Sequence, residues 1–508
     1  MPSILGLLET AMSQTPTLSP KQPKLRHGLI PVIALIAFIG GNALLHGGSD
    51  WAPHIPLILG AAVAALVGLT LGYSWKDMET GIVDGISVGM KAILILCVIG
   101  IMIGTWVASG IVPLMIYYGL QALHPSIFLV VSCLVCCVVS LATGSSWVTA
   151  GTVGIALIGV GQGLGVPPSM AAGAIISGSY FGDKMSPFSD STNLAPAVAG
   201  SEIFEHIRHM LYTTIPALVI ALVLYAALGF RGFEGQSSSE AIEEIEAILS
   251  TLKTSFNLNL LLLLPPLLIV LMVVLKLPAL PVLLGAALLG ALLALGFQET
   301  SLVAILDVAQ SGYTAETGNT TVNELLARGG LGSMMDTVSL ILCSLTFGGV
   351  MERCGFLRVI AESILKVARS TGSLVTATIS TCIGMNIVAS DQYLSIIVPG
   401  RMYREAYEQK GLCAKNLSRT LEDAGTLTSP LVAWNTCGAF MSQTLTVATF
   451  AYLPYCFLNL LTPLIAITLA YTGWTIAKRQ PSIKPHTPPP APTNAPTEPI
   501  QRGNNTGE

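Results

Sequence analysis

Long apolar segments recur along most of this chain, separated by short polar stretches. A helix needs about 20 residues, at a rise of 1.5 Å per residue, to cross the hydrocarbon core of a bilayer. The segments that predict such helices are Leu29–Leu45, Ile55–Tyr73, Ala92–Val112, Ser126–Ala142, Leu211–Phe230, Leu258–Leu275, Ala279–Phe297, Thr337–Val350 and Ala451–Trp474. No soluble core needs so many of them, so the pattern predicts an all-α polytopic membrane protein.

The composition agrees with this pattern, because 52% of the 508 residues are hydrophobic and only 10% are charged, compared with about 25% in soluble domains. The net charge of −4 is small and no basic patch alternates with aromatic residues, so we expect no nucleic-acid partner. The polar segment Met1–Arg26 lacks a cleavable signal, which predicts that the first apolar segment stays in the membrane. No nucleophile–base pair or metal motif is visible, so we expect neither an enzyme nor a bound cofactor.

The chain repeats itself at an offset near 245 residues. Gly110 corresponds to Gly355, and Cys137 corresponds to Cys382. Polar segments that interrupt the apolar runs recur in the same order in both parts. The common order and spacing of these matches indicate two related halves.

Basic residues alternate between corresponding connections of the two halves. Val112–Pro125 has no Lys or Arg, whereas its counterpart Gly355–Gly372 contains three. Short cytoplasmic loops are enriched in Lys and Arg, so corresponding connections are expected on opposite sides of the membrane. In the first half, this interpretation treats Lys76, Lys91 and Lys184 as loop charges. An inverted repeat of this kind is typical of secondary transporters, whose sites lie near the middle of the membrane.

The predicted organisation has two inverted-topology repeats, residues 28–230 and 257–478. Each is expected to contain about five transmembrane helices, a re-entrant helical hairpin and a broken helix. Glu240–Thr251 has the spacing of an amphipathic helix on the surface. The remaining segments are predicted to be a cytoplasmic N-terminal tail (1–27), an extracytoplasmic acidic linker (231–256) and a disordered, Pro-rich cytoplasmic tail (479–508).

Each predicted hairpin bends at a polar tip, Thr143–Trp147 in the first half and Ala389–Gln392 in the second. Loop charges do not distinguish a hairpin from two full crossings. The polar tips favour hairpins, because irregular backbone at membrane depth is tolerated where it is buried in protein or lines a cavity. Asp391 is the one acid at either tip, and it is interpreted as an ion-binding residue or as a helix cap. The tip candidates for ion binding are Ser145, Ser146, Ser390 and Asp391.

The polar run Gly182–Asn193 is the strongest local signal. Gly182 and Pro187 are both expected to interrupt a helix, which frees backbone carbonyls beside oxygen-bearing side chains. Hard cations prefer such oxygen ligands. A carboxylate near the bilayer centre costs about 2.5–3.5 kcal/mol on insertion scales, an expense that folding alone does not require. The candidates are Asp183, Ser189, Asp190, Thr192 and Asn193; the alternative is an exposed cytoplasmic loop.

The corresponding run in the second half, Glu422–Asn435, again combines helix breakers with oxygen-bearing side chains. Its candidate ligands are Thr426, Ser429 and Asn435. Glu422 and Asp423 are interpreted either as site residues or as the cytoplasmic end of a helix. His206 and His209 are expected at the cytoplasmic surface.

A buried carboxylate favours its protonated form, whereas a bound cation favours the ionised form. One carboxylate can therefore bind either a proton or Na⁺, and a site that opens alternately to each side then exchanges one for the other. Asp183, Asp190 and Asp391 are the candidates for this role.

The segment Gly178–Pro196 resembles the signature of the NhaC family of bacterial Na⁺/H⁺ antiporters, and Ile207–Leu211 also fits it. Ser390–Tyr393, Pro399–Met402 and Ser429–Thr436 are similar to the family in the second half. The resemblance covers about residues 26–478.

This resemblance implies a multi-pass antiporter of the bacterial cytoplasmic membrane that exchanges internal Na⁺ for external H⁺. Some members of the family instead exchange malate and protons for lactate and Na⁺. Lys184 is the one basic residue expected near the middle of the membrane, which favours inorganic cations over a carboxylate substrate. The expected partners are membrane lipid, Na⁺ and H⁺, and a homodimer is compatible with this reading.

Overall fold

The computed structural model describes residues 20–46, 52–232, 239–275 and 277–479. Within these residues the fold is helical throughout, and Leu412 and Lys478 form an isolated β-bridge. The two tails, 1–19 and 480–508, lie outside the described residues, as does the part of the acidic linker at 233–238.

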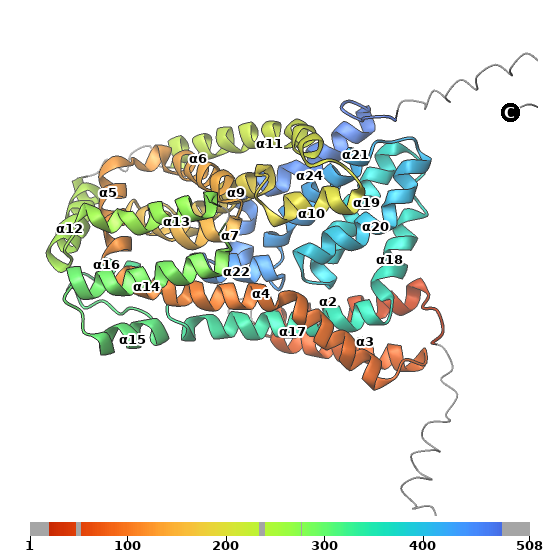
Figure 1. The fold of residues 1–508 in the computed structure, drawn as a ribbon, viewed down its shortest axis with the longest axis horizontal. Coiled ribbons are helices and arrows are strands. Elements are labelled where there is room, and N and C mark those ends of the chain that lie inside the picture. Colours follow the sequence, from red (N-terminus) through yellow and green to blue (C-terminus); the bar gives the residue numbers. More distant parts are fainter. Residues whose placement is uncertain (1–19, 47–51, 233–238, 276, 480–508) are drawn as a thin grey trace, which may run out of the picture.

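The first part of the chain forms a bundle of long and short helices (Figure 1). Its elements are α2 (Leu25–Leu45), α3 (His54–Thr70), α4 (Trp75–Ala108), α5 (Ile111–Ala122), α6 (Pro125–Thr143), α7 (Ser146–Thr149), the π turn η1 (Ala150–Gly154), α8 (Ile155–Gly163), α9 (Pro168–Met185), α10 (Asp190–Ala199) and α11 (Ile203–Gly232).

The second part continues the bundle. Its elements are α12 (Ser239–Ser255), η2 (Leu260–Leu263), α13 (Leu264–Val274), α14 (Ala279–Phe297), α15 (Leu302–Ser311), α16 (Thr320–Leu326), η3 (Gly332–Met334), α17 (Met335–Arg353), α18 (Phe356–Leu365), α19 (Thr371–Val388), α20 (Gln392–Gln409), α21 (Ala414–Leu421), the π turn η4 (Glu422–Thr426), η5 (Ser429–Leu431), α22 (Thr436–Leu445), α23 (Thr449–Tyr452), η6 (Leu453–Tyr455) and α24 (Phe457–Thr472).

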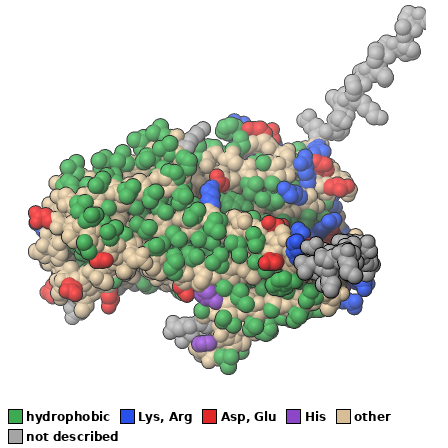
Figure 2. Space-filling model, turned by 60° about the horizontal axis from the view of Figure 1, so that its bottom comes forward, with side chains coloured by type: hydrophobic (Ala, Val, Ile, Leu, Met, Phe, Trp, Pro, Cys, Tyr) green, Lys and Arg blue, Asp and Glu red, His purple; other side chains and the backbone are tan. Residues whose placement is uncertain are grey.

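Most of the long helices run along the long axis of the molecule (Figure 1). Seven of the described helices are long and apolar enough to cross a membrane, or up to nine if each bent helix pair counts as one span. Hydrophobic side chains cover the middle of the face in Figure 2, and charged side chains gather toward its two ends. This distribution agrees with the predicted all-α protein that crosses a membrane many times.

Close packing between helices depends on small residues. A Cβ on Gly182 of α9 would lie 2.2 Å from the backbone N of Leu141 in α6. A Cβ on Gly349 of α17 would lie 2.4 Å from the carbonyl oxygen of Gly81 in α4. Small residues let helix backbones approach in membranes, where hydrophobic burial gives little drive for helix association.

Two expectations about helix boundaries were wrong. Lys76 and Lys91 both lie within the 34-residue helix α4 rather than in a connection. Gly182 does not interrupt its helix, because α9 continues to Met185 and the break comes after it. Gly182 is needed instead for the contact with α6, which explains why glycine stands there.

The predicted amphipathic helix of the acidic linker is confirmed as part of α12, whose Ile248 and Leu252 are buried. At the other end of the chain, the segment after α24 packs against the start of α21. There the backbone N of Cys413 donates to the carbonyl of Ala477 at 2.9 Å, and a guanidinium nitrogen of Arg419 donates to the hydroxyl of Thr475 at 3.1 Å.

Candidate functional site

Two polar turns lie where the predicted hairpin tips were expected. Gly144, between α6 and α7, has a φ of +68°, and Ser390, between α19 and α20, has a φ of +59°. A Cβ on Gly144 would lie 2.7 Å from the backbone carbon of Phe188. The first tip therefore packs directly against the break that follows α9, and only glycine fits this approach.

Each tip also caps the helix that follows it. The Ser145 hydroxyl accepts a hydrogen bond from the backbone N of Val148 at 3.3 Å. The Asp391 carboxylate accepts one from the backbone N of Leu394 at 3.0 Å. The helix-cap interpretation of Asp391 is thus confirmed, although this residue also lines a cavity, as described below.

The break between α9 and α10 spans residues 186–189. The Thr192 hydroxyl lies 2.9 Å from the carbonyl oxygens of both Asp183 and Lys184. The Asn193 amide donates to the carbonyls of Pro187 at 2.8 Å and Ser189 at 2.7 Å. Thr192 and Asn193 therefore stabilise the backbone of the break, and neither side chain lines the cavity.

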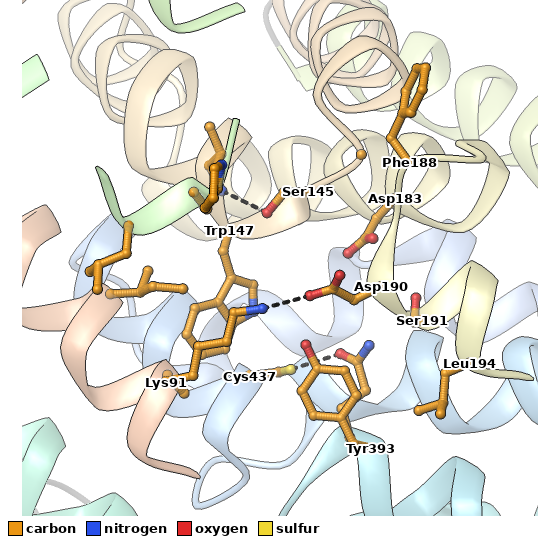
Figure 3. Close-up of a pocket in the computed structure, with 18 of the residues that line it drawn as sticks. Lys91, Ser145, Trp147, Asp183, Phe188, Asp190, Ser191, Leu194, Tyr393 and Cys437 are labelled. Atoms are coloured by element: carbon orange, nitrogen blue, oxygen red, sulfur yellow. Dashed lines mark hydrogen bonds and ion pairs between the residues drawn. The ribbon is translucent and has the colours of Figure 1, made fainter. Parts of the chain in front are cut away.

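A cavity of about 1110 Å³ lies between α4, the first tip, the break after α9 and the start of α20. Figure 3 shows Asp183 and Asp190 from one side and Tyr393 from the other pointing into it. The polar residues that line it include Lys91, Thr143, Ser145, Asp183, Asp190, Ser191, Asp391, Gln392, Tyr393 and Thr436. All three predicted aspartates thus reach one cavity.

Asp183 is nearly buried, with 8% of the residue exposed, and hydrogen bonds fix both of its carboxylate oxygens. One carboxylate oxygen accepts hydrogen bonds from the backbone N of Ser146 at 3.2 Å and from its hydroxyl at 2.6 Å. The other accepts one from the Ser189 hydroxyl at 2.5 Å. Three donors orient this carboxylate, and they come from the first tip and from the break.

Asp190 has a different environment. It forms an ion pair of 2.9 Å with Lys91 of α4, and these side chains are 63% and 64% exposed. Lys91 was not predicted as a site residue, because the pattern of loop charges placed it in a connection. The available signal was a single basic residue directly before the apolar segment Ala92–Val112.

The second half places several predicted ligands away from the cavity. The Thr426 hydroxyl donates to Glu422 at 2.9 Å, the Ser429 hydroxyl donates to the Gln392 side chain at 3.2 Å, and the Asn435 amide donates to the carbonyl of Asn386 at 3.1 Å. Ser390 is fully buried. The break in this half does exist, since the helical segments change from α to π to 3₁₀ between α21 and α22.

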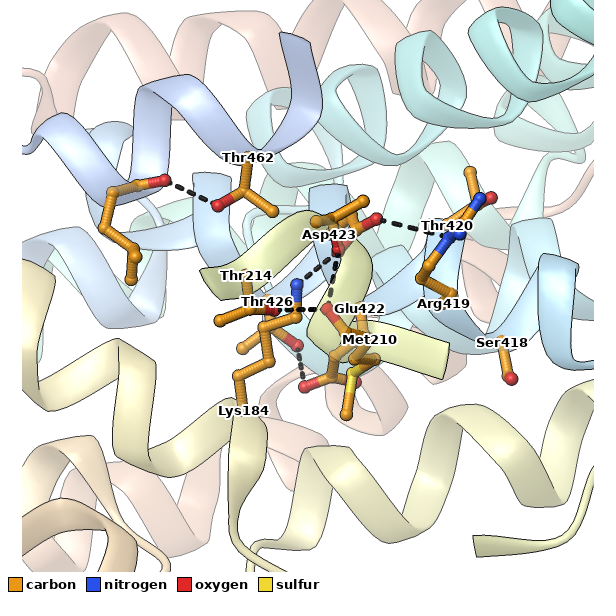
Figure 4. Close-up of polar contacts among 12 residues, drawn as sticks. Lys184, Met210, Thr214, Ser418, Arg419, Thr420, Glu422, Asp423, Thr426 and Thr462 are labelled. Carbon is orange, nitrogen blue, oxygen red and sulfur yellow. Dashed lines mark hydrogen bonds and ion pairs between the residues drawn. The ribbon is translucent and has the colours of Figure 1, made fainter. Parts of the chain in front are cut away.

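A second polar cluster lies between the two breaks (Figure 4). Lys184 forms an ion pair with Asp423, and both side chains are fully buried. Arg419, also fully buried, lies 3.9 Å from Asp423, and the Thr213 hydroxyl donates to Asp423 at 2.9 Å. Glu422 is likewise fully buried, so these two acids are interior residues rather than an exposed helix end.

The assignment of Lys184 as a loop charge was wrong, because its side chain is enclosed by protein, as is that of Arg419. His206 and His209 were expected at the surface, yet both are buried, where they bond to the side chains of Ser418 at 2.9 Å and Asn416 at 3.2 Å. Hydropathy alone does not reveal a charge that is neutralised by a distant residue.

Comparison with known proteins agrees with the local geometry. The sequence model described as "Na+/H+ antiporter family" matches residues 178–474. The Na(+)/H(+) antiporter NhaC of Alkalihalophilus pseudofirmus is 42% identical over 429 residues, which cover 84% of this chain and 92% of that protein. The malate-2H(+)/Na(+)-lactate antiporter of Bacillus subtilis is 40% identical, with 83% and 89% covered. The arginine/ornithine antiporter ArcD of Halobacterium salinarum is 36% identical, with 92% and 95% covered.

The matched region contains both breaks, the second tip and the second polar cluster, whereas Lys91 and the first tip precede it. The relatives extend the similarity over most of the first half as well. The chain therefore belongs to the Na⁺/H⁺ antiporter family.

Proposed function

We propose that this protein exchanges Na⁺ for H⁺ across the cytoplasmic membrane by alternating access, with Asp183 as the carboxylate that binds either ion. One observation carries the proposal: Asp183 is buried and oriented by three hydrogen bonds, and it also lines the large cavity. The similarity to two named NhaC antiporters supports the choice of ions.

The surroundings of Asp183 suit a hard cation that competes with a proton. Carboxylate and hydroxyl oxygens are the ligands that hard cations prefer, and Ser145 and Asp391 line the same cavity. A cation at Asp183 stabilises the ionised carboxylate, whereas burial without a cation favours the protonated one. Occupancy by either ion then excludes the other.

Alternating access would follow from the two halves having inverted topology. Gly110 and Gly355 support this relation: each precedes the helix after a long span, with φ values of +84° and +70°. In each half a tip of positive φ and a broken helix follow in the same order. Inverted repeats of this type form a site at their interface in secondary transporters.

For orientation, we place the end of the molecule with α18, α20 and α21 (Figure 1) in the cytoplasm, and we infer that both termini lie on the same side of the membrane. Arg358, Arg404 and Lys410 lie on or beside these helices, which agrees with the enrichment of Lys and Arg on the cytoplasmic side. The acidic helix α12 lies at the opposite end of the molecule (Figure 1).

The test is Na⁺-driven proton movement in energised everted vesicles. Addition of Na⁺ is expected to dissipate the pH gradient with the wild-type protein, and Asp183→Asn is expected to reduce the response at least 100-fold. Asp307→Asn, an exposed acid on α15 away from the cavity, is the matched control and should respond as wild type. A wild-type protein without any response to Na⁺ or Li⁺ between pH 7 and 9 would contradict the proposal.

A second candidate, exchange of an organic acid coupled to Na⁺ and H⁺, is favoured by Lys91. This ammonium group lines a cavity of about 1110 Å³, which exceeds what a monatomic ion needs and offers a cation for a carboxylate substrate. The malate/lactate antiporter is among the relatives. Malate-dependent, Na⁺-linked uptake into vesicles that Lys91→Gln abolishes would establish it in place of the first candidate.

A further inference from the structure

A line of four side chains connects the cavity to the second polar cluster. Asp183 accepts from the Ser189 hydroxyl at 2.5 Å, the Ser189 and Ser191 hydroxyls lie 3.1 Å apart, and the Ser191 hydroxyl lies 2.8 Å from Glu422. None of these four residues is more than 8% exposed. Asp183 and Glu422 therefore stand at the two ends of one buried chain of hydroxyl groups.

The hydrogens along this chain can be counted. It has three contacts, and each needs one hydrogen, but two serine hydroxyls supply only two. If both carboxyl groups were ionised, the Ser189 hydroxyl would donate to Asp183 and the Ser191 hydroxyl to Glu422. The two serine oxygens would then lie 3.1 Å apart without a hydrogen between them. All three contacts become hydrogen bonds only when one of the carboxyl groups, Asp183 or Glu422, carries a proton.

The charges around the chain lead to the same count. Asp423 contacts two buried cations, Lys184 and Arg419, and the hydroxyl chain adds two further buried acids, Asp183 and Glu422. One proton among the acids makes this group neutral, which lowers the cost of burying it. The other titratable side chains buried on the elements around Glu422 are Tyr180, His206, His209, Cys382, Tyr403 and Tyr407.

We propose that Glu422 is a second proton-binding residue, and that one proton is shared between Glu422 and Asp183 through Ser189 and Ser191. This inference rests on the proposed Na⁺/H⁺ exchange. In the transfer, Glu422 gives its hydrogen to the Ser191 oxygen, Ser191 gives its own hydrogen to the Ser189 oxygen, and Ser189 gives its own to Asp183. Three O–H bonds break and three form, and the net result is the movement of one proton.

A cation arriving at Asp183 from the cavity then displaces the proton along the chain to Glu422, which does not line the cavity. For net exchange, Glu422 releases this proton to water while the cation is bound, and a proton taken up after the cation has left returns along the chain to Asp183. With the proton on Asp183, one Glu422 oxygen accepts from Ser191 and Thr426. With the proton on Glu422, the same oxygen donates to Ser191 and still accepts from Thr426, while the other oxygen has no hydrogen-bond partner among the described residues.

Ser191 and Thr426 provide a matched pair for the test. Both hydroxyls donate to the same oxygen of Glu422, at 2.8 and 2.9 Å, but only Ser191 continues the chain toward Asp183. A purely structural role predicts similar effects of Ser191→Ala and Thr426→Ala. The relay predicts that Ser191→Ala reduces Na⁺-driven proton flux at least tenfold and that Thr426→Ala reduces it less than threefold.

The measurement uses the purified full chain in liposomes, with Na⁺-driven proton flux as one readout and exchange of ²²Na⁺ for unlabelled Na⁺ at equal pH as the other. In Ser191→Ala and Glu422→Gln, Na⁺-driven proton flux is expected to fall at least tenfold, whereas Na⁺/Na⁺ exchange is expected to stay within threefold of wild type. The retained Na⁺/Na⁺ exchange also shows that the variants are folded. Ser191→Thr should restore the flux, since it replaces the hydroxyl.

Different failures have different meanings. Wild-type flux in Ser191→Ala, or equal losses in Ser191→Ala and Thr426→Ala, would overturn the relay and leave Na⁺/H⁺ exchange standing. A wild-type protein that moves no protons in response to Na⁺ would overturn both proposals. Loss of Na⁺/Na⁺ exchange in Ser191→Ala that Ser191→Thr does not restore would assign the chain a structural role and overturn the relay.

Discussion

The ammonium group of Lys184, at the end of α9, forms an ion pair with the carboxylate of Asp423, in the π turn that follows α21, and neither side chain is exposed to solvent. Lys184 lies in the last turn of α9, directly before the first helix break, and Asp423 lies within the second break. The pair therefore joins the two halves of the chain at their least regular segments, directly beside the candidate ion site.

Removal of one partner of this pair should destabilise the protein strongly. Lys184→Met leaves the Asp423 carboxylate buried without its ammonium partner, and breaking a buried ion pair typically costs about 3–5 kcal/mol. We expect a clear decrease in the thermal unfolding midpoint of the detergent-purified protein. The double variant Lys184→Met/Asp423→Leu should recover part of the loss, because the Asp423 carboxylate is removed together with its ammonium partner. The recovery stays partial because Arg419 then loses its ion-pair partner.

The matched control is the exposed pair of Arg358 and Glu362, 2.7 Å apart with side chains 77% and 42% exposed. Exposed pairs contribute about 0–1 kcal/mol, so Arg358→Met should shift the midpoint little. Equal shifts for Lys184→Met and Arg358→Met would contradict the assigned role of the buried pair.

Lys91 should weaken cation binding in the wild-type protein. Its ammonium group is paired with Asp190 inside the cavity, and it both repels an arriving Na⁺ and neutralises a nearby carboxylate. Lys91→Gln is expected to lower the apparent KM for Na⁺ by about two- to fivefold, with a smaller effect at high salt because the pair is exposed. The vesicle assay at several Na⁺ concentrations measures this.

Lys91→Arg keeps the charge and should keep the wild-type KM. An increase of the KM for Na⁺ in Lys91→Gln would show that the ammonium group supports binding instead, as expected for an anionic substrate.

Two substitutions separate the cap function of Asp391 from a function in ion binding. Asn caps helices about as well as Asp, whereas Ala costs about 1 kcal/mol. If Asp391 contributes its charge to the cavity, Asp391→Asn should reduce Na⁺-driven proton flux at least tenfold while the unfolding midpoint stays near wild type. If it is a cap alone, Asp391→Asn should transport normally and Asp391→Ala should be less stable.

Gly182 should not tolerate a side chain. A Cβ there would lie 2.2 Å from the backbone N of Leu141, so Gly182→Ala forces α9 away from α6, at an expected cost of about 1–3 kcal/mol. Gly384, inside α19, has no atom within 4 Å of its added Cβ. Gly384→Ala should therefore be neutral or stabilising by up to about 1 kcal/mol. Similar unfolding midpoints for the two variants would contradict the packing argument.

The sequence pattern predicted the helical class, the two polar turns, both broken helices and the aspartates that line the cavity. That the turns are tips of re-entrant hairpins stays a prediction. These features depend on local sequence, because a polar run inside an apolar segment indicates an interrupted helix regardless of the rest of the fold. Asp183 could be selected because a carboxylate at membrane depth needs a reason to be there.

The pattern did not predict which polar groups contact one another across the two halves. Lys184 appeared to be a loop charge because its partner, Asp423, is 239 residues away along the chain. Lys91 was assigned to a connection because a single polar residue on one face of a long helix looks, in the sequence, like the end of the apolar segment. Thr426 and Ser429 were correctly assigned to the break, but the side chains that they contact were not predicted. In an irregular segment the direction of each side chain depends on tertiary packing rather than on a helical repeat.

The long separation of Lys184 and Asp423 also matters for biogenesis. At about 5–20 residues per second, the ribosome needs roughly 12–48 s to add the 239 residues between them. During this time the first half must hold an ammonium group without its final partner, in water, at the lipid headgroups or beside the insertion machinery. The break after α9 can therefore reach its final depth only once the second half has been synthesised, so that translation of residue 423 sets the earliest moment at which the ion site can be completed.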